Sequence, residues 1–105
     1  MADVSRSVVV TIQNPEGLHL RPMDLFVKLA SQFKSKIEVL RAGERVDGKS
    51  MLAMMTLASV QGTQLRVEAT GPDADAALDA LAALVARGFG EMTEAPPLPS
   101  NATST

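Results

Sequence analysis

The first third of the chain passes from an alternating pattern of apolar and polar residues to a helical one. Val8, Val10 and Ile12 alternate with Ser7, Val9 and Thr11, and this period of two predicts a strand with one buried face. Asn-Pro-Glu-Gly at 14–17 predicts a turn. Apolar residues then recur at helical spacing from 20 to 33, where Pro22 fits only in the first turn because it lacks a backbone donor. We therefore expect a strand, a tight turn and an amphipathic helix.

The rest of the chain predicts two more helices and three more strands. They are short strands at 37–40 and 44–47 joined by a turn at 42–43, a helix at 51–57 capped by Ser50, a strand at 64–69 and a long helix at 73–87. Asp73 and Asp75 near the start of the last helix and Arg87 near its end suit the helix dipole, and Gly88 is a candidate C-cap. Four strands with the helices on one face predict a two-layer α+β domain.

Composition narrows the classes of protein to which the chain can belong. We place one domain with a single core at 1–90, and expect the Pro-rich polar stretch at 91–105 to be a disordered tail. Three Phe, no Trp or Tyr and a formal net charge of −2 argue against a nucleic-acid partner. There is no cysteine for disulfides or thiol chemistry, and no stretch is apolar for long enough to span a bilayer. We expect a cytoplasmic monomer that binds no membrane and needs no metal or other cofactor.

Residues 43–50, GERVDGKS, match the nucleotide-binding pattern G-x-x-x-x-G-K-S. A phosphate cradle favours small, flexible residues whose backbone donors turn inward, whereas Glu-Arg-Val-Asp fills the interior of this motif. The preceding strand also joins it by a tight turn, while a parallel nucleotide-binding sheet needs longer, helical crossovers. We therefore reject the interpretation of the chain as a nucleotide-hydrolysing enzyme.

His19 is the only histidine, and it falls where the predicted turn meets the first helix. The backbone donors of Leu20 and Arg21 at a helix start have no helical partners, and the helix dipole there favours an added anion. The same positive potential favours the neutral ring that a nucleophile requires. Arg21 can reach transferring phosphoryl oxygens and stabilise their charge. A lone histidine is usually an unreactive surface residue, but this combination suits accepting and releasing a phosphoryl group.

Three short sequence motifs resemble those of HPr, and they follow one another in the same order and at similar separations. HPr is the histidine-containing phosphocarrier family of the bacterial phosphoenolpyruvate-dependent phosphotransferase system. The motifs are Gly-Leu-His-Leu-Arg-Pro at 17–22, Gly-Lys-Ser at 48–50 and Gln-Gly-Thr at 61–63. The resemblance implies an HPr-like open-faced β-sandwich, a four-stranded antiparallel sheet with three helices on one face. It further implies that His19 takes phosphate on Nδ1, as pros-phosphohistidine, from phospho-enzyme I and passes it to an EIIA domain. Arg21 would assist, and the chain would be a carrier rather than an enzyme.

Ser50 has an ordinary explanation as a helix cap. The resemblance adds that an HPr kinase/phosphorylase modifies this serine in some bacteria, which brings about −1.5 to −2 charges to the helix start. Flexible thioethers in the helix that follows suit a surface that binds several partners in turn. By analogy with the family, the expected docking residues are Leu20, Met51, Leu52 and Met55, with Met54 and Leu57 on the opposite flank of the helix.

Two acidic residues depart from the common pattern of the family. Glu16 precedes His19 by three residues, and Asp24 stands in the first turns of the helix, where a small residue is usual. Carboxylates near the histidine argue against the partner choice of the sugar-transport members of the family. Leu20, Met23 and the Lys-rich segment after Phe33 make the chain more similar to the nitrogen-branch variant, NPr, whose outputs are regulatory rather than sugar uptake. The alternative function is a regulatory interaction module, in which Ser50 or the Met-rich face binds an effector and phosphotransfer is secondary.

Overall fold

The computed structural model describes residues 5–57 and 59–90, so the predicted tail at 91–105 lies outside the described residues. The elements follow one another in the predicted order. They are β1 (Ser5–Thr11), α1 (Leu20–Ala30), β2 (Lys36–Arg41), β3 (Glu44–Asp47), α2 (Met51–Met54), a 3-10 turn η1 (Met55–Leu57), β4 (Gln64–Thr70), α3 (Ala74–Ala86) and a second 3-10 turn η2 (Gly88–Gly90).

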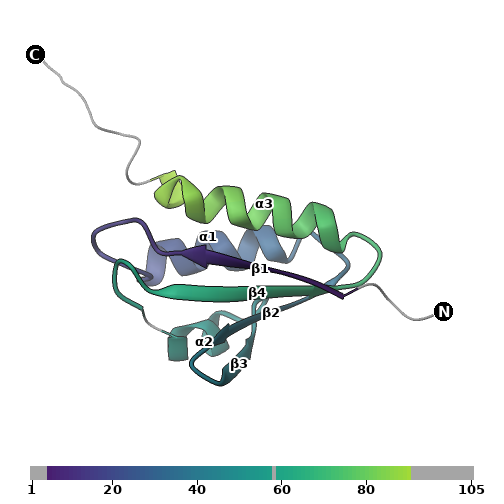
Figure 1. The fold of residues 1–105 in the computed structure, drawn as a ribbon, viewed down its shortest axis with the longest axis horizontal. Helices are drawn as coiled ribbons and strands as arrows, with labels where there is room; N and C mark the ends of the chain where they lie inside the picture. Colours follow the sequence, from purple (N-terminus) through teal and green to yellow (C-terminus); the bar gives the residue numbers. More distant parts are fainter. Residues whose placement is uncertain (1–4, 58, 91–105) are drawn as a thin grey trace, which may run out of the picture.

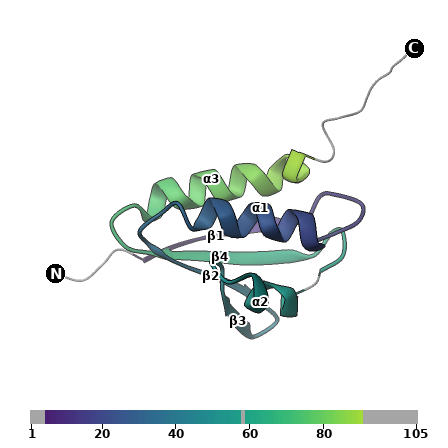
Figure 2. The ribbon, with the colours of Figure 1, turned by 180° about the vertical axis from the view of Figure 1, so that it is seen from behind.

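The four strands form one antiparallel sheet in the order β1-β4-β2-β3. Helices α1 and α3 run side by side across one face of this sheet, and α2 lies beside β3 (Figure 1). Seen from behind, α1 passes in front of β1 and β4, and no helix of residues 5–57 and 59–90 covers the opposite face of the sheet (Figure 2). The predicted α+β open-faced sandwich is therefore confirmed.

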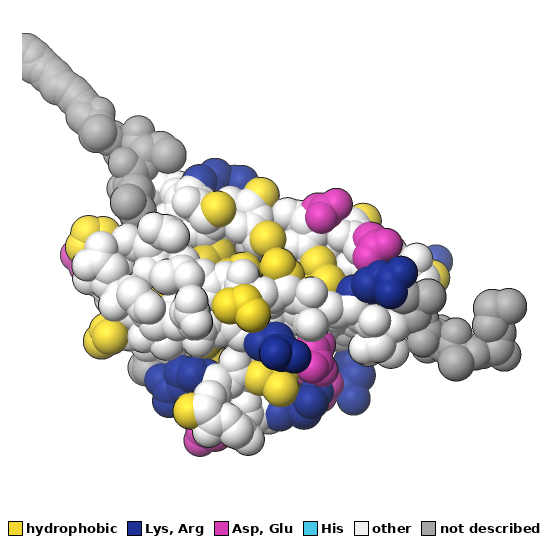
Figure 3. Space-filling model, in the orientation of Figure 1, with side chains coloured by type: hydrophobic (Ala, Val, Ile, Leu, Met, Phe, Trp, Pro, Cys, Tyr) yellow, Lys and Arg dark blue, Asp and Glu magenta, His cyan; other side chains and the backbone are white. Residues whose placement is uncertain are grey.

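Alternation along the strands separates a core face from an open face. Val67 and Val39 are fully buried under the helices together with Leu81 of α3, as the period of two requires. On the open face, Arg45 lies 2.7 Å from carboxylate oxygens of both Glu38 and Glu68. These hydrogen bonds, to Glu68 first and then Glu38, raise the pKa of Arg45 above its ordinary value. Figure 3 shows hydrophobic, basic and acidic side chains intermixed on this face of the molecule.

Helix α1 is shorter than predicted, because it ends at Ala30 rather than at residue 33. The next residues form tight turns instead, in which the N–H groups of Gln32 and Phe33 donate to carbonyls three residues earlier. The chain then reaches Ser35, whose side chain is buried. The Ser35 hydroxyl donates a hydrogen bond to Asp73, which lies 38 residues further along the sequence. The residues after α1 thus contact the start of α3 instead of continuing the helix.

The carboxylate of Asp73 has a different role from the one predicted for it. Asp73 is the N-cap residue of α3, but its side chain makes no cap hydrogen bond with that helix. It accepts hydrogen bonds from the backbone N–H groups of Lys34 and Ser35 and from the Ser35 hydroxyl. The Ser35 hydroxyl and then the Lys34 N–H lower the pKa of Asp73 to about 2. Asp73 thus fastens the α1–β2 connection to the start of α3.

The predicted end of α3 agrees with the structure. Arg87 is the C-cap residue, and Gly88 directly after it has φ +61°, the left-handed conformation that glycine adopts most readily after a helix.

Among the described residues, no helix is both long and apolar enough to cross a membrane.

Candidate functional site

The turn before His19 is held against a distant segment of the chain. Leu18 donates its N–H to the carbonyl of Ser59, 2.7 Å away, and forms an isolated bridge with it. Gly17 makes this approach possible, because a Cβ added there would lie 2.2 Å from that same carbonyl oxygen, and φ is +74°. Asn14 is fully buried and donates to the Gly17 carbonyl at 2.6 Å. The backbone that leads into His19 is thereby fixed on both sides.

His19 is the N-cap residue of α1, with an extended backbone and no side-chain cap hydrogen bond. Its carbonyl accepts the N–H of Met23 at 3.0 Å, while Pro22 has no N–H to offer. Met23 is thus the first residue to donate a hydrogen bond within α1. The N–H groups of Leu20 and Arg21 precede it and point out of the start of the helix. The His19 side chain is 36% exposed and Arg21 is exposed, so both are accessible from solvent. This geometry places a histidine, an arginine and a helix start within three consecutive residues.

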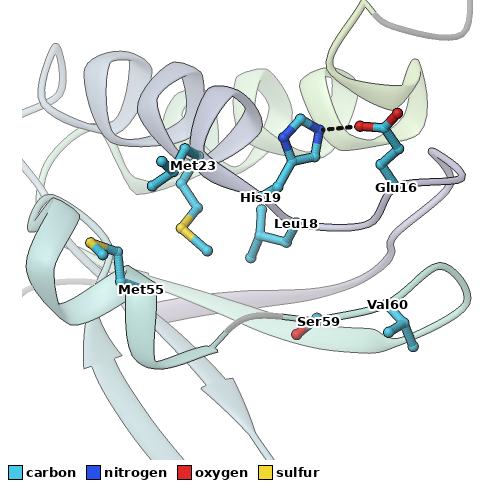
Figure 4. Close-up of a pocket in the computed structure, with 8 residues that line it drawn as sticks. Glu16, Leu18, His19, Met23, Met55, Ser59 and Val60 are labelled. Atoms are coloured by element: carbon cyan, nitrogen blue, oxygen red, sulfur yellow. Dashed lines mark ion pairs between the residues drawn. The ribbon is translucent and has the colours of Figure 1, made fainter.

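The two acidic residues near the site behave differently. Asp24 lies 2.9 Å from Nζ of Lys28, one turn along α1, and forms an ion pair there. Glu16 is 80% exposed, and its Oε1 atom lies 3.6 Å from Nε2 of His19 (Figure 4). Of these two carboxylates, it is therefore Glu16 whose charge lies against the histidine ring.

A shallow hollow of about 440 Å³ opens beside the histidine (Figure 4). Its lining is mainly apolar and comes from both sides of the Leu18–Ser59 bridge. It is lined by Glu16, Leu18, His19, Leu20, Met23, Met55, Ser59 and Val60. An apolar concavity with a few polar groups at its edge is a common form of binding site.

The predicted docking residues divide into two sets around this hollow. Leu20 and Met55 line it and are exposed. Leu52 is 78% exposed but does not line the hollow, and Met51 is half-buried against the core. The opposite flank is fully buried, as Met54 and Leu57 both have no exposed surface.

Val60 was not among the predicted site residues. It is 75% exposed and lines the hollow from the segment after η1. The available signal was a large apolar residue directly before the Gln61-Gly62 turn, where exposure is expected. Its position beside His19 depends on the Leu18–Ser59 bridge, which joins segments about forty residues apart in the sequence.

The rejected nucleotide-binding motif is not a phosphate cradle. Its interior forms β3, which pairs with β2 in antiparallel register. Gly48 is buried against β2, where an added Cβ would lie 2.8 Å from the side chain of Ile37. Lys49 directs its Nζ to the carbonyl of Phe33 at 2.7 Å, just after α1. Ser50 caps α2, because its Oγ accepts the N–H of Ala53 at 3.1 Å. The rejection of nucleotide binding therefore agrees with the structure.

Comparison with known proteins now identifies the family. Residues 6–87 match the family model described as the PTS HPr component phosphorylation site. The chain belongs to the HPr family. It is 43% identical over 81 residues to the phosphocarrier protein HPr of Cupriavidus necator, an alignment that covers 77% of this chain and 91% of that relative.

Larger phosphoryl-transfer proteins contain a similar segment. The chain is 43% identical over 93 residues to the phosphoryl donor subunit DhaM of a PEP-dependent dihydroxyacetone kinase from Klebsiella michiganensis. This alignment covers 89% of the chain but 20% of DhaM, so the likeness is to one part of that protein.

Solved structures of HPr have the same fold. The crystal structure of HPr-C-His from Thermoanaerobacter tengcongensis superimposes with a TM-score of 0.79 at 40% identity, covering 82% of this chain and 97% of that one. HPr from Bacillus anthracis gives a TM-score of 0.75 at 35% identity, covering 78% and 98%. The predicted family and fold are confirmed, and the chain is a phosphocarrier of the phosphotransferase system.

Proposed function

We propose that His19 is the residue on which this HPr-family protein carries its phosphoryl group. In this proposal Nδ1 of His19 takes the group from phospho-enzyme I and gives it to an EIIA domain. The observation that carries the proposal is the position of His19, partly exposed at the N-cap of α1 inside the matched phosphorylation-site segment. The chain itself turns over no small molecule, so it acts as a carrier and not as an enzyme.

The start of α1 supports both the loading and the unloading of phosphate. The donors of Leu20 and Arg21 and the positive end of the helix attract the phosphoryl oxygens. The Arg21 guanidinium adds charge stabilisation as the group moves between His19 and its partner. One arginine and two amides hold the group only moderately, which suits a carrier that must release it.

The apolar hollow is the proposed docking surface for both partners. Leu20 and Met55 line it, and Leu52 extends it along the exposed side of α2. Enzyme I and an EIIA domain use the site in turn, because each must bring its own phosphoryl-carrying group to His19. The acidic Glu16 at the rim of the hollow favours the regulatory nitrogen branch over sugar uptake as the downstream pathway. In this proposal the carrier acts as a cytoplasmic monomer.

Ser50 is the proposed site of regulatory phosphorylation, by an HPr kinase/phosphorylase. Its hydroxyl already accepts a hydrogen bond at the start of α2, so a phosphate there would meet favourable backbone donors. The added negative charge would repel an acidic partner that docks over Leu52 and Met55. This switch is also the basis of the alternative function, a regulatory module that binds an effector through the same helix.

Labelling with radioactive phosphoenolpyruvate and the cognate enzyme I tests the assignment of His19. We expect an adduct that is labile in acid and stable in base on the unmodified protein, and none on His19→Ala. Circular dichroism of His19→Ala provides the control for folding, since the partly exposed ring contributes little to the core. Label that persists on a folded His19→Ala variant would show that another residue accepts the phosphate.

The same assay separates the carrier from the regulatory module. Ser50→Asp should retain acceptance by His19 but slow transfer to the EIIA partner. The module hypothesis instead predicts that Ser50→Asp changes effector affinity while His19→Ala does not. Partner binding that is indifferent to Ser50→Asp and lost in His19→Ala would exclude the module.

A further inference from the structure

The four methionines within residues 5–57 and 59–90 differ sharply in their exposure to solvent. Met54 has no exposed surface and Met23 is 3% exposed, whereas Met55 is 49% exposed. Met51, at the start of α2, is half-buried because it packs against the core. Met55 is therefore the methionine of this part of the chain that a reagent in solution reaches most readily.

Met55 is exposed at the hollow beside His19. It begins η1 and lines the hollow together with Leu20 and Val60, which are 60% and 75% exposed. In Figure 4, Met55 lies on the η1 side of the hollow, and Met23 lies across from it on α1. Leu20, Met55 and Val60 thus remain in water around one concavity, and of these three only Met55 carries an oxidisable sulfur.

Oxidation would change the character of this surface. Hydrogen peroxide converts a thioether to a sulfoxide, which turns a flexible apolar side chain into a polar one with a strong hydrogen-bond acceptor. The Ser59 hydroxyl, a polar group in the same lining, already donates to the carbonyl of Leu57. A docked partner that covers the hollow would strip water from the sulfoxide oxygen without this hydroxyl to replace it, and binding would weaken.

We propose that Met55 is an oxidation site through which peroxide reduces the affinity of this carrier for its phosphotransfer partners. The inference rests on the proposed function, because it concerns the surface on which enzyme I and the EIIA domain dock. The Sδ lone pair of Met55 attacks one peroxide oxygen, the oxygen–oxygen bond breaks, and the departing hydroxide takes the proton of the transferred oxygen to form water. Sulfur loses two electrons, and the two peroxide oxygens gain one each.

The modification is reversible, which suits regulation. A methionine sulfoxide reductase returns the sulfur to a thioether, while two thiols of a reductant are oxidised to a disulfide and the oxygen leaves as water. This cycle changes no atom of His19 or Arg21. Oxidation should therefore raise the enzyme I concentration needed for half-maximal transfer, while transfer at saturating enzyme I stays near that of the untreated protein.

The first test follows the methionines by mass spectrometry of peptides from protein treated with dilute hydrogen peroxide. Met55 should become a sulfoxide before Met51, and well before the two buried methionines, because oxidation follows exposure. Met1 and Met92, which lie outside the described residues, are scored in peptides of their own. Conversion of Met51 ahead of Met55 in the folded protein would overturn the assignment of Met55.

The second test measures loading from radioactive phosphoenolpyruvate at limiting enzyme I, before and after peroxide. Oxidised protein should load roughly tenfold more slowly, the cost of covering one polar group that lacks a partner. Treatment with methionine sulfoxide reductase should restore the rate.

Two variants show which sulfur is responsible. Met55→Leu keeps an apolar side chain of similar volume but has no sulfur, so its loading rate, whatever its starting value, should be the same before and after peroxide. Met51→Leu is the matched control, since it removes a sulfur from the same short helical segment and should lose rate on oxidation as the unmodified protein does. An equal loss in Met55→Leu would show that another site is responsible.

Titration calorimetry with unphosphorylated enzyme I separates this inference from the function on which it rests, because it measures docking without phosphate. The Kd should rise roughly tenfold on oxidation of the unmodified protein and stay constant in Met55→Leu. If His19 is labelled but neither the Kd nor the loading rate responds to oxidation of Met55, the role of Met55 is wrong and the carrier function stands. If His19 is never labelled, the proposed function is wrong, and the Kd still decides whether oxidation of Met55 weakens docking.

Discussion

At the scale of single residues, Gly17 controls whether the histidine can be presented at all. Its missing side chain lets the turn before His19 approach the Ser59 carbonyl closely enough for the Leu18 N–H to bond there. This one contact aligns the start of α1 with the segment that follows η1, and so forms both sides of the hollow. The site therefore depends on a residue that has no functional group.

Gly17→Ala should destabilise the fold and open the site. We expect a loss of about 3 kcal/mol in the free energy of unfolding in urea, from the strain of a positive φ together with the overlap with Ser59. Gly43→Ala is the matched control, because Gly43 also has a positive φ, +87°, but no atom lies within 4 Å of its added Cβ. It should cost about 1–2 kcal/mol. Equal losses in the two variants would contradict the importance of the close approach.

At the scale of elements, the short helical segment after Ser50 has one buried and one exposed face. Met54 and Leu57 are completely buried, while Leu52 is 78% exposed on the other side. The period of a helix predicted this division from the sequence, since positions three apart share a face. Which face would meet the core was not determined by the helix alone, because both faces carry methionine and leucine.

Met54→Ala and Leu52→Ala should separate packing from docking. Removing the buried thioether should lower the free energy of unfolding by about 2–5 kcal/mol. Removing the exposed leucine should change it by less than about 0.5 kcal/mol but slow phosphoryl exchange with enzyme I. Urea denaturation and the rate of label transfer measure the two effects. A Leu52→Ala variant with normal transfer to and from both partners would remove Leu52 from the docking surface.

At the scale of the whole molecule, Asp73 couples segments that are far apart in sequence. Its carboxylate accepts hydrogen bonds from Lys34 and Ser35, after α1, while its backbone begins α3. The Ser35 hydroxyl and the Lys34 N–H lower its pKa from 3.8 to about 2. The ionised form is thus the one that the folded protein prefers.

Asp73 should make stability depend on acid. Because the folded pKa is depressed, the unfolded chain takes up the proton first as the pH falls, so the contribution of Asp73 is complete above about pH 4 and is lost toward pH 2. Asp73→Asn should therefore lower the Tm at pH 7 and flatten the decline in Tm between pH 4 and 2. Asp75→Asn removes an exposed carboxylate that pairs with Arg6, and should leave that decline unchanged. An identical decline in both variants would show that other groups control the acid transition.

The sequence alone predicted the elements and their order, and it singled out His19 as the candidate phosphoryl acceptor. Period-two and helical patterns are local, and the run around His19 combines a helix start with a nucleophile within a few residues. The tertiary structure decided where α1 ends, what Asp73 binds, which carboxylate faces His19, and that Val60 lies beside it. Each of these depends on a contact between segments that are distant in the chain or on a side-chain direction within a turn. Such contacts form only when the sheet and helices pack together, because no local pattern specifies the distance between two separate segments.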